Sequence, residues 1–167
     1  MQIQAADVIK LTNDIWATML GMELAPCDRV DLAGAQPVLA ASVELIGDWH
    51  GSIRLDCSSR LACQAAARFV GADPAEISSE QVRDALAELT NMTAGSVKSL
   101  LPCAPRLTIP DTQTSALSML ARGDSLLQSA FTCEGEPLLV TIVQRGEPGK
   151  SGPRSNQTNV AFNRLND

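Results

Sequence analysis

Residues 84–95 of this chain read DALAELTNMTAG. Within this run, Asp84, Glu88, Asn91 and Gly95 follow one another at intervals of four, three and four residues. On an α-helix, which turns 100° per residue, these four positions lie within roughly 60° of one another. The apolar residues of the run occupy a different arc, which is the face that a helix buries: Ala85, Leu86, Leu89, Met92 and, just beyond it, Val97. The pattern predicts a helix that displays the four residues, called the motif stripe below, to a partner.

The start and the end of this helix are marked in the sequence. Ser78, followed three residues later by Gln81, has the pattern of a capping box, and Glu80 suits the positive end of the helix dipole. Pro102 disfavours helical geometry at the residue before it. The helix is therefore expected to begin near Ser79 and to have about 22 residues available, or roughly 33 Å at 1.5 Å per residue.

The rest of the chain predicts two more helices and several strands. Apolar residues recur at helical spacing from about Ala5 to Leu20 and from Ser59 to Val70, and a glycine that can end a helix follows each. Glycine-containing turns at 47–51 and 134–136 suit hairpins. The strands are expected at Pro37–Ile46, Ser52–Asp56, Arg106–Ile109, Ala116–Leu120, Ser125–Cys133 and Pro137–Val143. The expected fold class is α+β, with long helices packed on a mainly antiparallel β-sheet.

Length and charge narrow the organisation and the partners. A chain of 167 residues suits one domain with a tail. We place the domain at residues 1–145, and a flexible tail at 146–167, where Gly, Pro, Ser, Asn and charged residues dominate. A net charge of −6 offers no basic surface for nucleic acid or an anionic membrane. With no apolar run of about 18 residues and no leader pattern at its start, the protein is expected in the cytoplasm.

Cysteine and histidine offer no metal or nucleophile chemistry. The five cysteines are scattered singly, so a disulfide framework or a zinc site is not expected, and each is interpreted as a small, mostly buried residue in a reducing compartment. His50 is the only histidine. A histidine-based metal cluster is therefore excluded, and nothing around His50 suggests a catalytic triad.

A short internal echo suggests two related halves. The tripeptide Leu-Thr-Asn occurs at residues 11–13 and again at 89–91. At the other stripe positions the first copy has Ala6, Lys10 and Ala17, so it lacks the acids and the glycine. Three matching residues are compatible with a duplication and equally with chance or ordinary helix packing. In either case only the second copy has the two carboxylates and the glycine of the motif stripe, which predicts one working site per chain.

The motif stripe resembles the signature of the CheC/CheX-type chemotaxis phosphatases. The order and spacing of Gly51–Leu55, of the helix at 61–71 and of Thr18–Gly21 are also similar to that family, and the resemblance covers about residues 5 to 145. One equipped motif resembles the CheX branch, because CheC proteins usually carry a second copy on the first helix. The resemblance therefore implies a CheX-like fold with an internal pseudo-repeat.

The resemblance implies removal of the phosphoryl group from the aspartyl-phosphate of a CheY-like response regulator. Asn91 would orient the attacking water, and Glu88 would pair with the regulator's lysine. Asp84 would contact the regulator or support the helix start, and Gly95 would permit close approach of the partner or of a neighbouring helix. The enzyme would need no cofactor of its own, since the phosphorylated regulator supplies the magnesium.

The sequence leaves three alternatives to a phosphatase open: a non-catalytic adaptor, a structural or dimerisation module, and a helix face that is merely solvated. A non-catalytic adaptor of the same fold would bind a receiver domain or a flagellar-switch component without hydrolysis. The fold alone would suffice for an acidic structural or dimerisation module, and acids on a helix often form only a solvated face. Relatives of the CheX type are often homodimers, so we expect a homodimer, for which a sheet edge formed by the final strands is one route.

Overall fold

The computed structural model describes residues 3–114 and 125–145 of the chain. Its helices are α1 (Ala5–Leu20), α2 (Ser59–Val70), the short 3₁₀ helix η1 (Pro74–Glu76) and α3 (Ser79–Ser99). Its strands are β1 (Ala25–Cys27), β2 (Val38–Ile46), β3 (Gly51–Ser58), β4 (Arg106–Leu107), β5 (Asp111–Thr114), β6 (Ser125–Cys133) and β7 (Glu136–Gln144).

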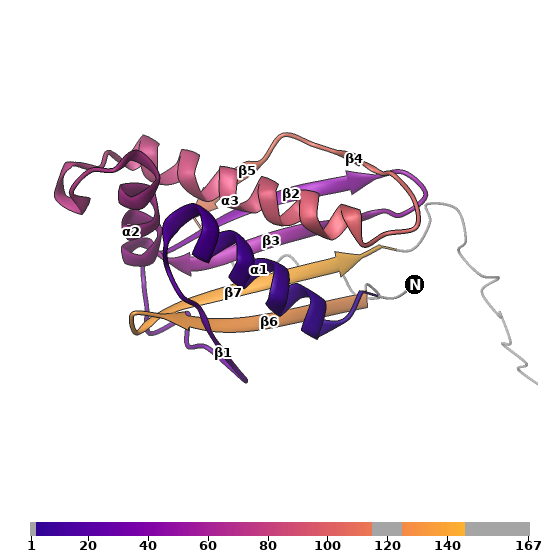
Figure 1. Cartoon of the computed structure of the whole chain (residues 1–167), viewed down its shortest axis with the longest axis horizontal. Helices are drawn as coiled ribbons and strands as arrows, with labels where there is room; N and C mark the ends of the chain where they lie inside the picture. The colour runs from indigo at the N-terminus through magenta and orange to yellow at the C-terminus, as the bar shows by residue number, and fades with distance from the viewer. Residues whose placement is uncertain (1–2, 115–124, 146–167) are drawn as a thin grey trace, which may run out of the picture.

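The strands form one antiparallel sheet that carries its long helices on a single face. The strand order is β1-β6-β7-β3-β2-β4, and β5 also pairs with β2. Figure 1 shows α1 and α3 lying across the same face of this sheet, with α2 beside one end of α3. α1 contacts β6, whereas α3 contacts β2. The predicted α+β class is thereby confirmed.

The strand order has the symmetry expected of two related halves. β1, β2 and β3 follow α1, and β5, β6 and β7 follow α3 in the chain. Leaving β4 aside, the six strands lie in the order β1-β6-β7-β3-β2-β5. If β1, β2 and β3 are exchanged with β5, β6 and β7, the same order results, read from the opposite edge. The topology supports the pseudo-repeat interpretation of the Leu-Thr-Asn echo, since α1 and α3 occupy equivalent places in the two halves.

Local capping explains why the three predicted helices have the bounds that the sequence indicates. Gly21 and Gly71 follow α1 and α2 with φ of 62° and 68°, the left-handed region that glycine adopts without strain. At the start of α3, the Ser78 hydroxyl accepts from the Gln81 N–H at 3.1 Å, and the Gln81 side chain accepts from the Ser78 N–H at 2.9 Å. The predicted capping box is confirmed.

The core lies between the helices and the sheet. Trp16 of α1, Leu89 of α3 and Phe131 of β6 are fully buried there, together with alternate residues of β2 and β3. The period of two along the strands and the helical period of α1 and α3 therefore meet in one apolar layer. None of the helices in the described ranges is long and apolar enough to span a bilayer.

The strands at the sheet edges differ from the sequence prediction. The strand expected at Arg106–Ile109 ends at Leu107, and the sequence prediction missed both β1 and β5. The final strands do not provide a continuous free edge, because β7 lies between β6 and β3, and β1 pairs with Ala130–Thr132 of β6. The strand predicted at Ala116–Leu120 and the tail at 146–167 fall outside the described residues, and the domain boundary at 145 stays a prediction.

The capping box of α3 gives a first stability prediction. Ser78→Ala removes the hydroxyl that accepts from Gln81 N–H and should lower the free energy of unfolding by about 1 kcal/mol. In a domain of this size the melting temperature should fall by roughly 2–4 °C, measured by circular dichroism. Ser79→Ala is the matched control, because Ser79 is the first helical residue and is not the cap. A loss of stability as large in the control would contradict the capping explanation.

Candidate functional site

The motif stripe lies on the outer face of α3. Asp84 and Glu88 are exposed, and Asn91 and Gly95 are half-buried. The opposite face of the helix is buried against the sheet and its neighbouring helices: Val82, Ala85, Leu86, Leu89, Thr90, Thr93, Ala94 and Val97. Met92, which the sequence placed in the apolar arc, is only partly buried but packs against the core. α3 therefore displays the four stripe residues as the spacing predicted.

Two threonines on either side of Asn91 are fully buried, and each donates its hydroxyl hydrogen bond within α3. The Thr90 hydroxyl donates to the Leu86 carbonyl and the Thr93 hydroxyl to the Leu89 carbonyl, both at 2.7 Å. Because each hydroxyl bonds to its own helix, burying it leaves no orphaned polar group. The helix can thus be packed tightly on both sides of Asn91 while the Asn91 amide faces outward.

The polar side chains of the motif stripe are free to bind a partner. Within residues 3–114 and 125–145, no hydrogen bond or ion pair engages the side chains of Asp84, Glu88 or Asn91. The Asn91 amide therefore keeps two donors and one acceptor, and Glu88 keeps a full carboxylate acceptor one helical turn away. Residues three apart on a helix have Cβ atoms about 5–6 Å apart, so one ligand can reach both groups.

Nothing in the described part of the fold requires a glycine at position 95. It is in the interior of α3, where glycine is about 1 kcal/mol less favourable than alanine. A Cβ placed on Gly95 would meet no atom of the described residues within 4 Å, apart from its own helix backbone and chain neighbours. Among residues 3–114 and 125–145, no neighbouring helix therefore packs against Gly95.

The equivalent face of α1 is chemically different. Lys10 stands where α3 has Glu88, and its Nζ donates to Asp14 Oδ2 at 2.7 Å. This hydrogen bond, together with the attraction of the Asp14 carboxylate, raises the pKa of Lys10. Asn13 is half-buried and corresponds to Asn91, but the Lys10–Asp14 pair occupies the surface beside it. The first copy of the echo thus has the amide without a free carboxylate next to it.

Neither the cysteines nor a metal cluster offers a competing site. All five cysteines are free; Cys57 and Cys133 are buried, and Cys27, Cys63 and Cys103 are half-buried. Burial raises the pKa of Cys57 to about 12, and burial followed by the charge of Glu134 raises the pKa of Cys133, so neither thiol forms a ready nucleophile. In the described part of the chain, no three histidine, cysteine or acidic side chains gather to hold a metal ion.

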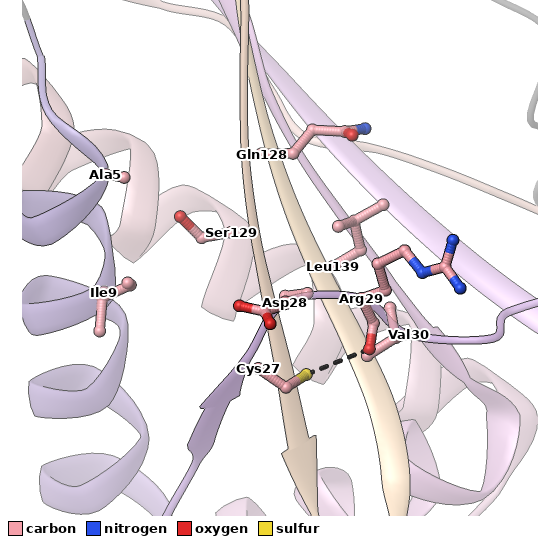
Figure 2. A pocket seen from close by; sticks show the side chains of 10 residues that line it. Ala5, Ile9, Cys27, Asp28, Arg29, Val30, Gln128, Ser129 and Leu139 are labelled. Carbon is pink, nitrogen blue, oxygen red and sulfur yellow. Dashed lines mark hydrogen bonds between the residues drawn. The ribbon is translucent and has the colours of Figure 1, made fainter.

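A pocket that the sequence did not predict lies in the half of the sheet away from α3. It has a volume of about 430 Å³ and lies between the start of α1, the segment after β1 and the edge of β6 (Figure 2). Its polar residues include Asp28 and Ser129, which have no motif spacing and come from distant parts of the chain. Nothing in the sequence signals it, because the pocket depends on how β1 ends beside β6.

An acid–acid–amide stripe displayed on a helix over an antiparallel sheet is the arrangement that the CheC/CheX resemblance led us to expect. The family model of the chemotaxis phosphatase CheX matches residues 39–125, just over half of the chain and including the whole motif stripe. The chain therefore belongs to the chemotaxis phosphatase CheX family, as the single equipped motif predicted. A comparison with curated proteins finds no match.

Solved structures share the fold at low sequence identity. A chemotaxis protein CheX from Vibrio vulnificus has a TM-score of 0.70 and 18% identity, over 86% of this chain and 100% of that chain. The CheX–CheY–BeF3–Mg complex from Borrelia burgdorferi gives a TM-score of 0.68 at 19% identity, over 87% of this chain and 100% of that chain. The middle domain of FliM from H. pylori is more distant, with a TM-score of 0.53 at 12% identity over 84% of this chain and 87% of that domain. These likenesses show the fold.

Proposed function

We propose that this protein hydrolyses the aspartyl-phosphate of a CheY-like receiver domain, with Asn91 and Glu88 as the catalytic residues. The observation that carries the proposal is the pair of unengaged side chains, one carboxylate and one amide, a single turn apart on a firmly packed helix. Membership of a phosphatase family gives the reaction class. The CheX from Borrelia burgdorferi, which has this fold, forms a complex with CheY, BeF3 and Mg.

The chemistry requires little more than a well-placed water. In an aspartyl-phosphate, the oxygen of an in-line water bonds to phosphorus while the bond to the aspartate oxygen breaks, which releases phosphate and a carboxylate. The receiver supplies the magnesium ion and a lysine that balance the charge of the phosphoryl group. An amide cannot take the proton of the water, but the Asn91 oxygen can accept a hydrogen bond from it and hold it in line. The proton then leaves with the phosphate or passes to solvent.

Glu88 would fix the position of the Asn91 amide. Its carboxylate is exposed and unpaired among the described residues, so it can form an ion pair with the receiver's lysine. Asn91 lies about 4.5 Å further along the helix axis, at 1.5 Å per residue. Two contacts on one rigid helix set both the distance and the direction of approach, which is what orientation of a nucleophile demands.

Asp84 and Gly95 would extend the docking surface at both ends. Asp84 is in the second turn of α3, beyond the first turn where the helix dipole favours acids, and Glu80 already occupies that first turn. Partner contact is therefore the better explanation for Asp84 than support of the helix start. Gly95 leaves open space on the other side of Asn91, where the main chain of a receiver can come close.

Substitution of Asn91 separates a phosphatase from an adaptor. Asn91→Ala should slow the loss of phosphate from phosphorylated receiver domains on the order of 10²-fold or more, because water is no longer held in line. Glu88→Ala should mainly raise KM, because the anchoring ion pair is lost. The measurement is phosphate release from a panel of phosphorylated receivers, together with binding to the same receivers carrying BeF3 as a stable phosphoryl mimic.

Asn13→Ala is the matched control for Asn91→Ala, because Asn13 holds the equivalent place on α1 beside the Lys10–Asp14 pair. It should keep the wild-type rate. Full activity of Asn91→Ala on a true substrate would disprove the proposed mechanism. If the wild type bound a phosphorylated receiver and accelerated hydrolysis on none, the adaptor function would replace the phosphatase.

Substitution of Gly95 should stabilise the fold and weaken docking of the receiver domain. Gly95→Ala should raise the melting temperature by a few degrees, because alanine is about 1 kcal/mol better in a helix interior and its methyl group meets no atom in the described part of the fold. The same methyl group should weaken binding to the BeF3-loaded receiver, and Gly95→Leu should weaken it on the order of tenfold or more through overlap with the partner.

Thr18→Ala provides the control for Gly95→Ala, since it raises helix propensity at an exposed position of α1 away from the motif stripe. Calorimetry and receiver binding measured side by side should show stabilisation in both variants and weaker binding only at Gly95. Wild-type binding by Gly95→Leu would mean that no partner approaches this glycine.

The protein should also form a homodimer in solution, and the sheet edge beside β2 is the better route. Ile109, between the outer strands β4 and β5, is 89% exposed, and an interface along this sheet edge would bury its apolar side chain. Ile109→Asp should shift the mass measured by sedimentation from dimer to monomer. Val70→Asp, which changes another exposed apolar residue at the end of α2, should leave the dimer intact. A wild type that stays monomeric at every concentration would refute the dimer.

A further inference from the structure

The displayed face of α3 continues past the motif stripe to Lys98. Lys98 is three residues after Gly95 and seven after Asn91. At 100° and 1.5 Å per residue, it lies within about 20° of Asn91 around the helix axis and about 10.5 Å further along that axis. A cation therefore stands on the same face as the amide and beyond it, whereas the two acids of the stripe, Asp84 and Glu88, precede the amide.

The ammonium group of Lys98 has no partner within the part of the chain that the structure describes. No hydrogen bond or ion pair of residues 3–114 and 125–145 engages its Nζ. Positions 94, 95, 101 and 102, three and four residues away, hold Ala, Gly, Leu and Pro, so no neighbour along the chain can neutralise it. Because the Lys98 side chain is half-buried, less of its rotamer freedom remains to be lost on binding. Lys98 thus presents an uncompensated charge on a partly restrained stem.

A favourable interaction with the helix dipole does not account for this placement. Lys98 is the basic residue in the last turn of α3, where the negative end of the dipole favours a cation. That effect acts at any position of the turn, including the exposed Ser99, and does not select the position that follows Gly95 on the displayed face. Arg68 has the same relation to the end of α2, which lies beside the start of α3 and therefore away from Lys98 (Figure 1). Arg68 is thus a reference for the dipole effect alone.

Gly95 gives Lys98 room to approach Asn91. In an α-helix each Cα–Cβ bond tilts toward the N-terminus, so the side chain of Lys98 starts toward the turn that contains Gly95. A Cβ on Gly95 would meet no atom of the described residues within 4 Å, apart from its helix backbone and chain neighbours. The space between the amide and the ammonium group is therefore open to a side chain of a partner.

We propose that Lys98 binds a carboxylate beside the magnesium site of the receiver domain, on the side of Asn91 opposite to Glu88; this inference rests on the proposed function. Magnesium is a hard cation that proteins hold through carboxylates and other oxygen ligands. The surface around the phosphorylated aspartate, which Asn91 has to reach, is therefore acidic. An ammonium group at the far end of the displayed face is the complementary charge.

The order of charges along α3 then fixes the direction in which a receiver docks. With Glu88 on a lysine and Lys98 on a carboxylate, two ion pairs of opposite sense lie on either side of the Asn91 amide. A receiver turned end to end would set a carboxylate against Glu88 and a lysine against Lys98, and like charges at both contacts oppose that arrangement. In-line attack depends on direction as well as distance, so Lys98 is a positioning residue. A receiver without this carboxylate should be a poor substrate.

The test is binding of BeF3-loaded receivers to variants of the full chain, measured by calorimetry at low and high salt. Lys98→Gln should weaken binding by about tenfold at low salt and by less at high salt, because salt screens an ion pair at the rim of an interface. Lys98→Arg keeps the charge and should stay within about threefold of the wild type. Arg68→Gln is the matched control, since it removes the same charge from the last turn of another helix. It should lose similar thermal stability and bind like the wild type.

An exchange of charges identifies the partner group. Lys98→Glu should bind on the order of 10²-fold more weakly than the wild type, because two carboxylates then face each other. Acidic residues of the receiver near the phosphorylation site, other than the magnesium ligands, are changed to lysine one at a time, and one change should restore binding of Lys98→Glu. The proposal is overturned if Lys98→Gln binds no more weakly than Arg68→Gln, or if no such change restores binding.

Failure of this inference can be told from failure of the proposed function. If Asn91→Ala loses hydrolysis as expected while Lys98→Gln binds like the wild type, only the role of Lys98 is wrong. If the wild type accelerates hydrolysis on no receiver but Lys98→Gln still weakens binding, the phosphatase function is wrong and Lys98 orients an adaptor.

Discussion

The rest of the structure depends on the burial of one face of α3 against the sheet. Leu86, Leu89 and Val97 are buried with the small residues between them, and burial of this continuous apolar surface supplies the driving force for packing the helix. Thr90 and Thr93 belong to the same face at no hydrogen-bonding cost, because their hydroxyls bond to carbonyls of α3. Burial of this face fixes the rotation of α3 about its own axis. Glu88 and Asn91, which lie on the opposite face, are therefore displayed together.

The two-half architecture explains why a chain with two similar helices has one equipped stripe. α1 and α3 occupy equivalent places over the sheet, and each has a fully buried threonine that bonds to the carbonyl four residues earlier, Thr12 to Val8 and Thr90 to Leu86. The buried side of the echo thus serves packing in both halves. The outer sides differ, because a surface position is under little packing constraint: among the described residues, α3 has an unpaired carboxylate beside its amide, whereas α1 has the Lys10–Asp14 pair.

The two sheet edges differ because their outer strands have different lengths. At the β2 edge, β4 and β5 together pair with residues 39–42 and 45–46, which leaves the exposed Ile109 between them. At the β6 edge, β1 pairs with only three residues and leaves an open pocket next to α1. Incomplete coverage of an edge strand thereby leaves an exposed apolar side chain on one side of the sheet and a pocket on the other.

The sequence by itself determined the three long helices, the two hairpins and the motif stripe. These features depend on local signals: the helical period of Leu86 and Leu89, the capping box at Ser78, and glycines such as Gly21 that end helices. Only the tertiary structure decided the edge strands β1 and β5, the open surroundings of Gly95 and the Asp28–Ser129 pocket. Strands of three or four residues pair through contacts distant in sequence, and a cavity depends on atoms from several segments, so no short stretch of the chain encodes either.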